Sequence, residues 1–130
     1  MDGLTTNSFL GPYRVSKHAL EAIAEAMHME LAPYGVKIAT LNPGSYLTGF
    51  NERTYETKWR WYDPSVNFTR IKDMTDIEKE ELADQDDPKD FIKVMVELIA
   101  ADESKFRNVH PKYSELYVKD FQKKAWTLMS

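Results

Sequence analysis

The stretch Gly11–Leu41, GPYRVSKHALEAIAEAMHMELAPYGVKIATL, joins a long helical pattern to a short apolar run and decides the fold class. Its first part carries apolar residues at three- and four-residue steps: Val15, Ala19, Leu20, Ile23, Ala24, Met27 and Leu31. This spacing predicts an amphipathic helix over Tyr13–Leu31. The run Val36–Leu41 is β-branched and has little polar alternation, which predicts a strand that is covered on both faces.

The middle of the chain predicts a loop and a further helix. Asn42–Gly44 ends the first strand, and an aromatic-rich stretch, expected to be a loop, then runs to about Arg70. A helix is expected over Thr75–Ala83, because Thr75 followed three residues later by a glutamate forms a capping box. A short strand is expected over Phe106–Val109.

Two more helices are predicted toward the end of the chain. Asp87 can cap the first of them, and Pro88 suits its first position. The face of this helix that should pack on a sheet comprises Phe91, Val94, Met95, Leu98 and Ile99. The last helix is predicted over Tyr113–Met129, with Tyr117, Phe121, Ala125 and Leu128 as candidate buried positions. A lone buried parallel strand cannot pair its own backbone groups, so we expect the chain to be part of a larger sheet.

Composition excludes several classes of function. The chain has 130 residues, a net charge of -4 and scattered Lys and Arg, which argues against a nucleic-acid partner. It has no cysteine, no apolar run of membrane-spanning length and no signal pattern, so we expect a cytoplasmic protein without a membrane or disulfides. His18, His28 and His110 are spaced unlike zinc ligands, so no metal site is predicted and surface or interface positions are expected.

Tyr13 and Lys17 are the candidate catalytic residues. Residues four apart lie on one face of a helix, so the phenol and the ammonium can point into the same small volume. A nearby cation favours the phenolate and lowers the pKa of a tyrosine, which makes the pair a workable general acid/base. An isolated pair of this kind is more often an ordinary turn of helix, so the surrounding sequence has to decide.

The surrounding sequence resembles the short-chain dehydrogenase/reductase family. The similarity runs from Gly11 to Phe50 and comprises the Tyr-x-x-x-Lys pair with Ser16, the long helix, the following strand, and a Pro-Gly-x-x-x-Thr motif at Pro43, Gly44 and Thr48. Two motifs in the right order, separated by one helix and one strand, are far more specific than either alone. The resemblance implies a Rossmann-like, doubly wound parallel sheet of the α/β class.

The resemblance also implies roles for single residues. Tyr13 would exchange a proton with a carbonyl or alcohol substrate, while Lys17 would lower the tyrosine pKa and bind the nicotinamide ribose. Pro43 and Gly44 resemble the turn under the nicotinamide ring, where a glycine lets the backbone approach a ligand. Tyr46 and Thr48 resemble residues that contact the cofactor, Tyr46 through its main chain.

Other parts of the family pattern are not in this sequence. The five glycines form no Gly-rich, diphosphate-binding turn, and the family's catalytic serine, a dozen positions before Tyr13, would precede Met1. We therefore expect residues 1–130 to be the C-terminal half of such a domain, without its N-terminal cofactor-binding half and with little turnover. NAD and NADP both stay open as cofactors, because the choice is made in the other half.

The aromatic stretch after Leu47 occupies the place of the family's substrate-covering segment. Phe50, Trp59 and Trp61 are its candidate substrate contacts, and they favour an apolar or ring-containing carbonyl or alcohol. Packing of these rings onto the body of the protein is the equal alternative.

Two alternatives to an oxidoreductase remain open in the sequence. The first is a non-catalytic interaction module that oligomerises through the first helix, whose second stripe comprises Ala19, Ala22, Ala26 and Met29. A homo-oligomer through this helix is expected in either case. The second is a standalone enzyme that uses Tyr13 and Lys17 in altered chemistry, which nothing else in the sequence supports.

Overall fold

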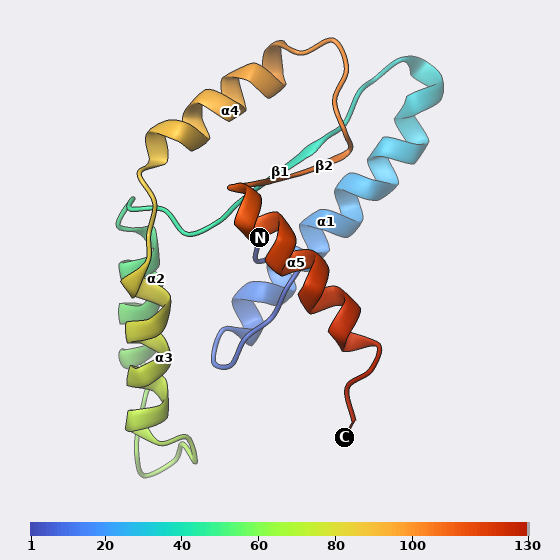
Figure 1. Cartoon of the computed structure of the whole chain (residues 1–130). Helices are drawn as coiled ribbons and strands as arrows, with labels where there is room; N and C mark the ends of the chain where they lie inside the picture. The colour runs from blue at the N-terminus through green and yellow to red at the C-terminus, as the bar shows by residue number, and fades with distance from the viewer. Residues whose placement is uncertain (130) are drawn as a thin grey trace. The chain divides into compact units, whose positions relative to one another are not determined.

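The computed structural model describes residues 1–129, and Figure 1 shows its five α-helices and two strands. In chain order these are α1 (Gly11–Leu31), a 3-10 turn (Ala32–Tyr34), β1 (Thr40–Pro43), α2 (Phe50–Trp59), α3 (Ile71–Ala83), α4 (Pro88–Ala100), β2 (Arg107–His110) and α5 (Lys112–Ala125). They form two compact units. The first holds residues 1–44 and the chain from Phe91 onward, and the second holds residues 45–90.

The first unit is built on a parallel pair of strands, which confirms the α/β class. Thr40 lies opposite Arg107 and Pro43 lies opposite His110. The predicted strand Val36–Leu41 is wrong at both ends, because pairing starts only where β2 offers a partner, at Thr40, and continues to Pro43. Beyond β1, the Gly44 amide still donates to the His110 carbonyl at 2.7 Å.

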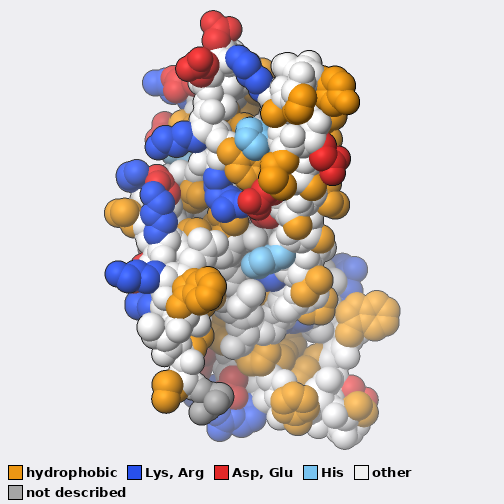
Figure 2. Space-filling model, turned by 90° about the vertical axis from the view of Figure 1, so that its right-hand side faces the viewer, with side chains coloured by type: hydrophobic (Ala, Val, Ile, Leu, Met, Phe, Trp, Pro, Cys, Tyr) orange, Lys and Arg blue, Asp and Glu red, His pale blue; other side chains and the backbone are white. Residues whose placement is uncertain are grey.

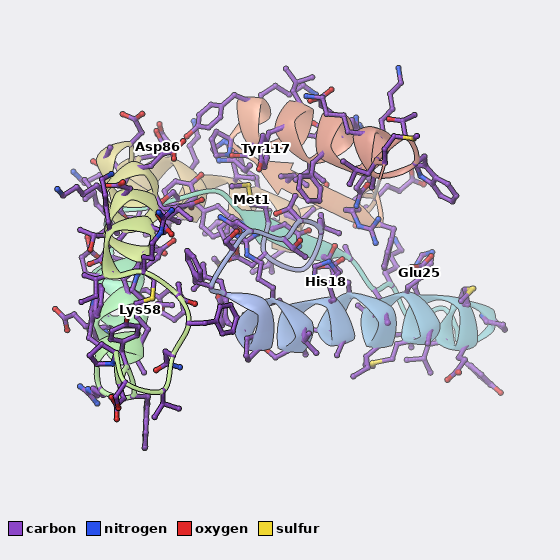
Figure 3. The ribbon with its side chains drawn as sticks, turned by 90° about the horizontal axis from the view of Figure 1, so that it is seen from below. Met1, His18, Glu25, Lys58, Asp86 and Tyr117 are labelled. Carbon is purple, nitrogen blue, oxygen red and sulfur yellow. The ribbon has the colours of Figure 1, made fainter. Side chains whose placement is uncertain are left out.

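Helix α1 confirms the predicted helix, but the face that it turns inward is not the predicted one. Val15, Leu20 and Ile23 of the apolar face are 70%, 56% and 55% exposed, whereas Arg14 is buried. Polar side chains can face inward here because they have hydrogen-bond partners. His28 Nδ1, for example, lies 3.2 Å from the Ile38 carbonyl oxygen. Seen from below, the two strands lie between α1 and α5 (Figure 3).

Helix α5 also buries an unexpected face. It ends at Ala125 rather than Met129, and it buries Ser114 and Val118 instead of Tyr117 and Leu128, which are 49% and 78% exposed. Ala125, a third predicted buried position, is likewise exposed, whereas Phe121 is half-buried. The reason is the close contact between the start of α5 and the turn after β1, which fixes the rotation of the helix.

Helix α4 begins as predicted. The Lys89 amide donates to Asp87 Oδ1 at 2.9 Å, so Asp87 caps the helix and Pro88 opens it. The predicted packing of its apolar face on a sheet is only partial in the described chain, since Phe91, Val94 and Leu98 are half-buried while Ile99 is 78% exposed. The cover that the two short strands give is limited to their near end, where the Phe91 ring lies 6.3 Å from the His110 ring of β2.

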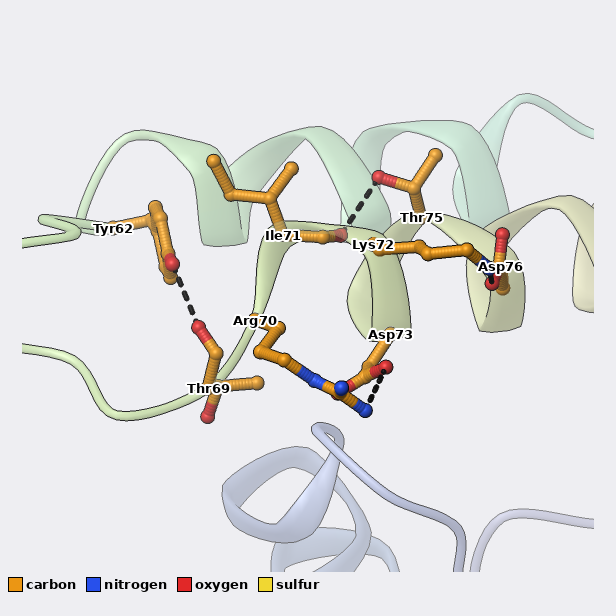
Figure 4. Close-up of polar contacts among 8 residues, drawn as sticks. All are labelled: Tyr62, Thr69, Arg70, Ile71, Lys72, Asp73, Thr75 and Asp76. Carbon is orange, nitrogen blue, oxygen red and sulfur yellow. Dashed lines mark hydrogen bonds and ion pairs between the residues drawn. The ribbon is translucent and has the colours of Figure 1, made fainter.

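The second unit contains a helix that the sequence pattern missed, α2, in the stretch expected to be a loop. Only Tyr55 of α2 is buried, so the helix carries no long apolar face to mark it. Helix α3 begins at Ile71, and Thr75 therefore lies inside it and donates to the Ile71 carbonyl at 2.9 Å (Figure 4). The predicted capping box is wrong, because the helix already begins one turn earlier, after Arg70, which pairs with Asp73.

Many large apolar side chains reach the surface. Figure 2 shows several of them on one face, and none of the helices that the structure describes is long and apolar enough to cross a membrane. The buried apolar side chains are few: Leu4, Tyr46, Tyr55, Met74 and Val118. The packing of the chain therefore depends strongly on polar contacts between its elements.

Candidate functional site

A cavity of about 210 Å³ in the first unit brings together three of the predicted site residues, Tyr13, Lys17 and Pro43. It is formed by the N-terminal residues, by α1 and by β1. Its full lining is Met1, Asp2, Gly3, Tyr13, Lys17, Leu20, Glu21, Leu41, Asn42 and Pro43. The helix and the strand that follow each other in the sequence thus contribute to one concave, largely polar site.

Tyr13 and Lys17 lie one helical turn apart on α1, and the Lys17 ammonium is 5.5 Å from the centroid of the Tyr13 ring. This is a cation–π position over the ring face. Burial raises the pKa of Tyr13, the Asp2 carboxylate raises it further, and Arg14 lowers it. The predicted lowering of the Tyr13 pKa is therefore wrong for the described chain, because burial and Asp2 outweigh the lowering by Arg14.

The N-terminal residues close one side of the cavity. The Met1 ammonium donates a hydrogen bond to the Pro43 carbonyl, and burial lowers the pKa of this amino group. Gly3 rests directly on α1, since a Cβ there would lie 2.8 Å from the Lys17 carbonyl oxygen. The Gln122 side chain of α5 donates to the Leu4 carbonyl at 3.2 Å. The segment is thus held from both sides.

Glu21 links the helix that carries Tyr13 to both strands. Its Oε1 accepts from the Asn42 side chain at 2.6 Å, and its Oε2 lies 3.4 Å from Arg107 Nε. Sequence reasoning missed Glu21 and Asn42 as site residues. A signal was present, because Glu21 follows Lys17 by four residues and so lies on the same face of α1.

Gly44 has a structural reason of its own to be glycine. A Cβ at this position would lie 2.6 Å from Ser114 Oγ and 2.8 Å from Pro111 Cδ. These distances are too short for real carbon contacts, so the turn after β1 approaches the start of α5 only because residue 44 has no side chain. Close approach of a ligand is not needed to explain this glycine.

The remaining predicted residues belong to the second unit. Tyr46 is buried and pairs with Asp86 as a short parallel bridge, while the Thr48 hydroxyl accepts from the Phe50 amide at 3.4 Å. Among the predicted substrate contacts, Trp59 donates its indole N–H to Glu78 at 3.1 Å. Phe50 and Trp61 are 45% and 82% exposed.

The three histidines lie apart from one another. His18 contacts the carbonyl of Arg14, His28 stacks on Phe106 with 4.8 Å between ring centroids, and His110 lies 6.3 Å from the Phe91 ring. Within residues 1–129 no group of three or more potential metal ligands comes together.

Comparisons with known proteins converge on one family. The profile of the family described as short chain dehydrogenase matches residues 1–59. The chain is similar to the uncharacterized oxidoreductase YusZ of Bacillus subtilis, with 48% identity over 48 residues, 37% of this chain and 17% of that protein. No solved structure gives a significant match.

Two further relatives have names that state a reaction. The NADPH-dependent 3-dehydrocapnine reductase of Ornithobacterium rhinotracheale is 48% identical over 46 residues, 35% of this chain and 16% of that protein. The 3-ketodihydrosphingosine reductase of Bacteroides thetaiotaomicron is 26% identical over 119 residues, 91% of this chain and 43% of that protein. In every case the match spans less than half of the relative.

Proposed function

The chain belongs to the short-chain dehydrogenase/reductase family, which its residues 1–59 match, and on that premise we propose that it is part of an NAD(P)-dependent oxidoreductase. The proposed reaction moves a hydride between a nicotinamide and a carbonyl or alcohol substrate. The observation that carries the proposal is the cavity that Tyr13, Lys17 and Pro43 line together.

The residues around the cavity fit the nicotinamide end of such a cofactor in kind. A phenol, an ammonium and Pro43 of the Pro-Gly turn surround one space, and Gly3 lets the N-terminal wall lie close to α1. When bound, the cofactor supplies or accepts the hydride. Tyr13 then gives its proton to the developing alkoxide oxygen in reduction, or takes it from the alcohol in oxidation.

Lys17 has a positioning and electrostatic part in this proposal. Its ammonium would donate to the ribose hydroxyls of the bound cofactor. Pro43 and Gly44 would supply the turn on which the nicotinamide end is held, and Tyr46 and Thr48 would supply further cofactor contacts. The choice between NAD and NADP belongs to other residues of the protein.

We propose an apolar carbonyl or alcohol as the substrate class. The exposed rings of Phe50 and Trp61 support this, because an aromatic side chain that is open to solvent has contact area to offer. Trp59 is a weaker candidate, since its indole N–H is already bound to Glu78. The names of two relatives, a 3-ketodihydrosphingosine reductase and a retinol dehydrogenase from mouse, point to substrates of the same kind.

We further propose that residues 1–130 act as the part of a Rossmann-like domain that carries the catalytic helix, and that alone they turn over little substrate. The absence of a Gly-rich, diphosphate-binding turn from the sequence supports this. We also propose a cytoplasmic place of action, which the lack of a long apolar run within residues 1–130 supports.

The decisive experiment titrates the purified, folded chain with NADH and with NADPH and follows nicotinamide fluorescence. Saturable binding that Lys17→Ala abolishes, and that Tyr13→Phe weakens, is the expected result if the cavity is a nicotinamide site. Lys93→Ala on the exposed side of α4 is the matched control. A folded chain that binds neither NADH nor NADPH would show that these residues form no cofactor site by themselves.

The second candidate function is a non-catalytic module that forms a homo-oligomer through α1. The apolar face of α1 favours it, because Val15, Leu20 and Ile23 are more than half exposed. Sedimentation of the wild-type chain and of Ile23→Glu tests this candidate. A monomer in both samples excludes the module, whereas an oligomer that the charge dissociates, in a folded chain that binds neither nucleotide, supports it.

A further inference from the structure

A buried arginine directly follows Tyr13 in the sequence and reaches back to the N-terminal segment. Arg14 is 3% exposed, and its Nη1 donates to the carbonyl oxygen and the hydroxyl of Thr5 at 3.1 and 2.6 Å. Its Nη2 lies 3.0 Å from Asp2 Oδ1. A guanidinium is stable in such a buried place only with partners of this kind, so Arg14 ties residues 2–5 to α1.

The same segment is fixed at further points along the cavity. Gly3 packs so closely on α1 that a Cβ would lie 2.7 Å from Glu21 Cγ, and the Leu4 carbonyl accepts from Gln122 of α5 at 3.2 Å. Thr5 is 1% exposed. Residues 2–5 therefore form a tightly seated wall beside Tyr13, and Arg14 is the charged group that anchors it.

The Asp2–Arg14 pair also brackets Tyr13 electrostatically. The charged groups that line the cavity with Tyr13 are the Met1 ammonium and Asp2 from the N-terminal segment and Lys17 and Glu21 from α1, and Arg14 follows Tyr13 directly on the helix and pairs with Asp2. After burial, Asp2 and Arg14 are the groups that act on the pKa of Tyr13, Asp2 raising it and Arg14 lowering it.

We propose that Asp2 and Arg14 are positioning residues for Tyr13, whose ion pair seats residues 2–5 against α1 and whose opposite charges regulate the proton of the phenol. The inference rests on the proposed function, in which Tyr13 transfers that proton.

The test is a pH titration of Tyr13 in the chain labelled with ¹³C at the tyrosine carbon that bears the hydroxyl. The Tyr13 signal is identified by its loss in Tyr13→Phe. Asp2→Asn keeps the shape of the side chain and removes its charge, and we expect it to lower the Tyr13 pKa. Glu25→Gln removes the same charge from a 60% exposed side chain further along α1 (Figure 3) and should leave the Tyr13 pKa in place.

Arg14→Met should shift the Tyr13 pKa in the opposite direction from Asp2→Asn. It removes the cation that lowers the Tyr13 pKa, so the titration should move upward. If Arg14→Met does not fold, Asp2→Asn against Glu25→Gln decides the matter. Equal titrations in these two variants would overturn the proposal, even if Asp2→Asn melts at a lower temperature, because a merely structural pair would change stability alone.

The Tyr13 titration needs no cofactor and no substrate. Its outcome therefore does not depend on whether the proposed function is correct. A wild-type chain that binds neither NADH nor NADPH, but whose Tyr13 pKa shifts in Asp2→Asn, would show that these residues form no cofactor site by themselves and would support the role of Asp2 and Arg14. A chain that binds NADH, but whose Tyr13 pKa is unchanged in Asp2→Asn, would support the cofactor site and refute the role of Asp2 and Arg14.

Discussion

Gly44 and Ser114 meet so closely that a Cβ on residue 44 would lie 2.6 Å from the Ser114 hydroxyl oxygen. The contact joins the turn after β1 to the first turn of α5, and Ser114 is itself 1% exposed. It sets the rotation of α5 and thereby decides that Ser114 and Val118, rather than Tyr117, face inward. A residue predicted as a cofactor contact thus also holds two elements of the first unit together.

Gly44→Ala should destabilise the first unit, because the new methyl group has to displace Ser114 and Pro111. We expect a loss of about 1–3 kcal/mol, the usual cost of overpacking. Urea unfolding followed by circular dichroism measures it. Gly11→Ala is the control, since nothing lies within 4 Å of a Cβ at that position. Equal unfolding midpoints in both variants would contradict the contact.

Tyr13 should make the stability of the chain fall at alkaline pH. Its pKa in the folded chain is raised above the ordinary value of 10.0, chiefly by burial, so the unfolded chain loses the proton first as the pH rises. The contribution of Tyr13 is complete below pH 10.0 and is lost as the pH climbs through the folded-state pKa. Tyr13→Phe should therefore be less sensitive to alkali than the wild type in thermal melts.

Tyr34→Phe is the matched control for this alkaline effect, because the Tyr34 side chain is 80% exposed. It should retain the wild-type decline above pH 10. A Tyr13→Phe chain that declines as steeply as Tyr34→Phe would show that the Tyr13 phenol is not held in a buried site.

Glu115 should contribute to stability in the opposite pH direction. Hydrogen bonds from Lys112 and Lys119 lower its pKa from 4.5 to about 2. The unfolded chain therefore binds the proton first on acidification, and the contribution is complete above pH 4.5 and lost as the pH falls toward 2. In thermal melts on both sides of this window, Glu115→Gln should lose less stability on acidification than the wild type.

Salt provides the check on Glu115, because its two ion pairs lie on the surface of α5. Raising the ionic strength should shrink the difference between wild type and Glu115→Gln at neutral pH. If the difference in stability between the wild type and Glu115→Gln changes with neither pH nor salt, the variant acts through helix propensity instead.

Glu78 should be the main polar link between α2 and α3. Its Oε2 accepts from the Trp59 indole at 3.1 Å and pairs with Lys58 at the same distance, and both charged side chains are mostly buried. Glu78→Leu should cost about 1–3 kcal/mol, since it leaves the Trp59 indole without this acceptor and leaves the Lys58 ammonium with the Met74 carbonyl alone. Urea unfolding of the second unit, followed by tryptophan fluorescence, measures this loss.

Two further variants sharpen the Glu78 prediction. Glu78→Gln keeps an acceptor for Trp59 and loses only the charge, so it should fall between the wild type and Glu78→Leu. Glu80→Gln changes an exposed side chain of the same helix and should behave as the wild type. Equal losses of stability in Glu78→Gln and Glu80→Gln would show that the ion pair between Glu78 and Lys58 does not contribute to stability.

Local sequence patterns were enough to predict the order of most elements and the family. Helix α1 and the cap of α4 followed from local rules, since apolar spacing and an Asp-Pro start act within one or two turns of chain. The Tyr-x-x-x-Lys and Pro-Gly-x-x-x-Thr motifs identified the family because their spacing is itself set by one helix and one strand. Lys17 and Tyr13 were placed on one helix face for the same local reason.

The buried faces of the helices and the direction of the Tyr13 pKa shift depend instead on packing between elements. The strand β1 is defined by its partner β2, and the inward face of α1 is chosen by the bonds that Arg14 makes to Thr5 and Glu21 makes to Asn42. These contacts join residues far apart in the chain, so no local pattern encodes them. Burial and the Asp2 carboxylate then reverse the effect on Tyr13 that a neighbouring lysine alone would have, because desolvation depends on everything packed around the phenol.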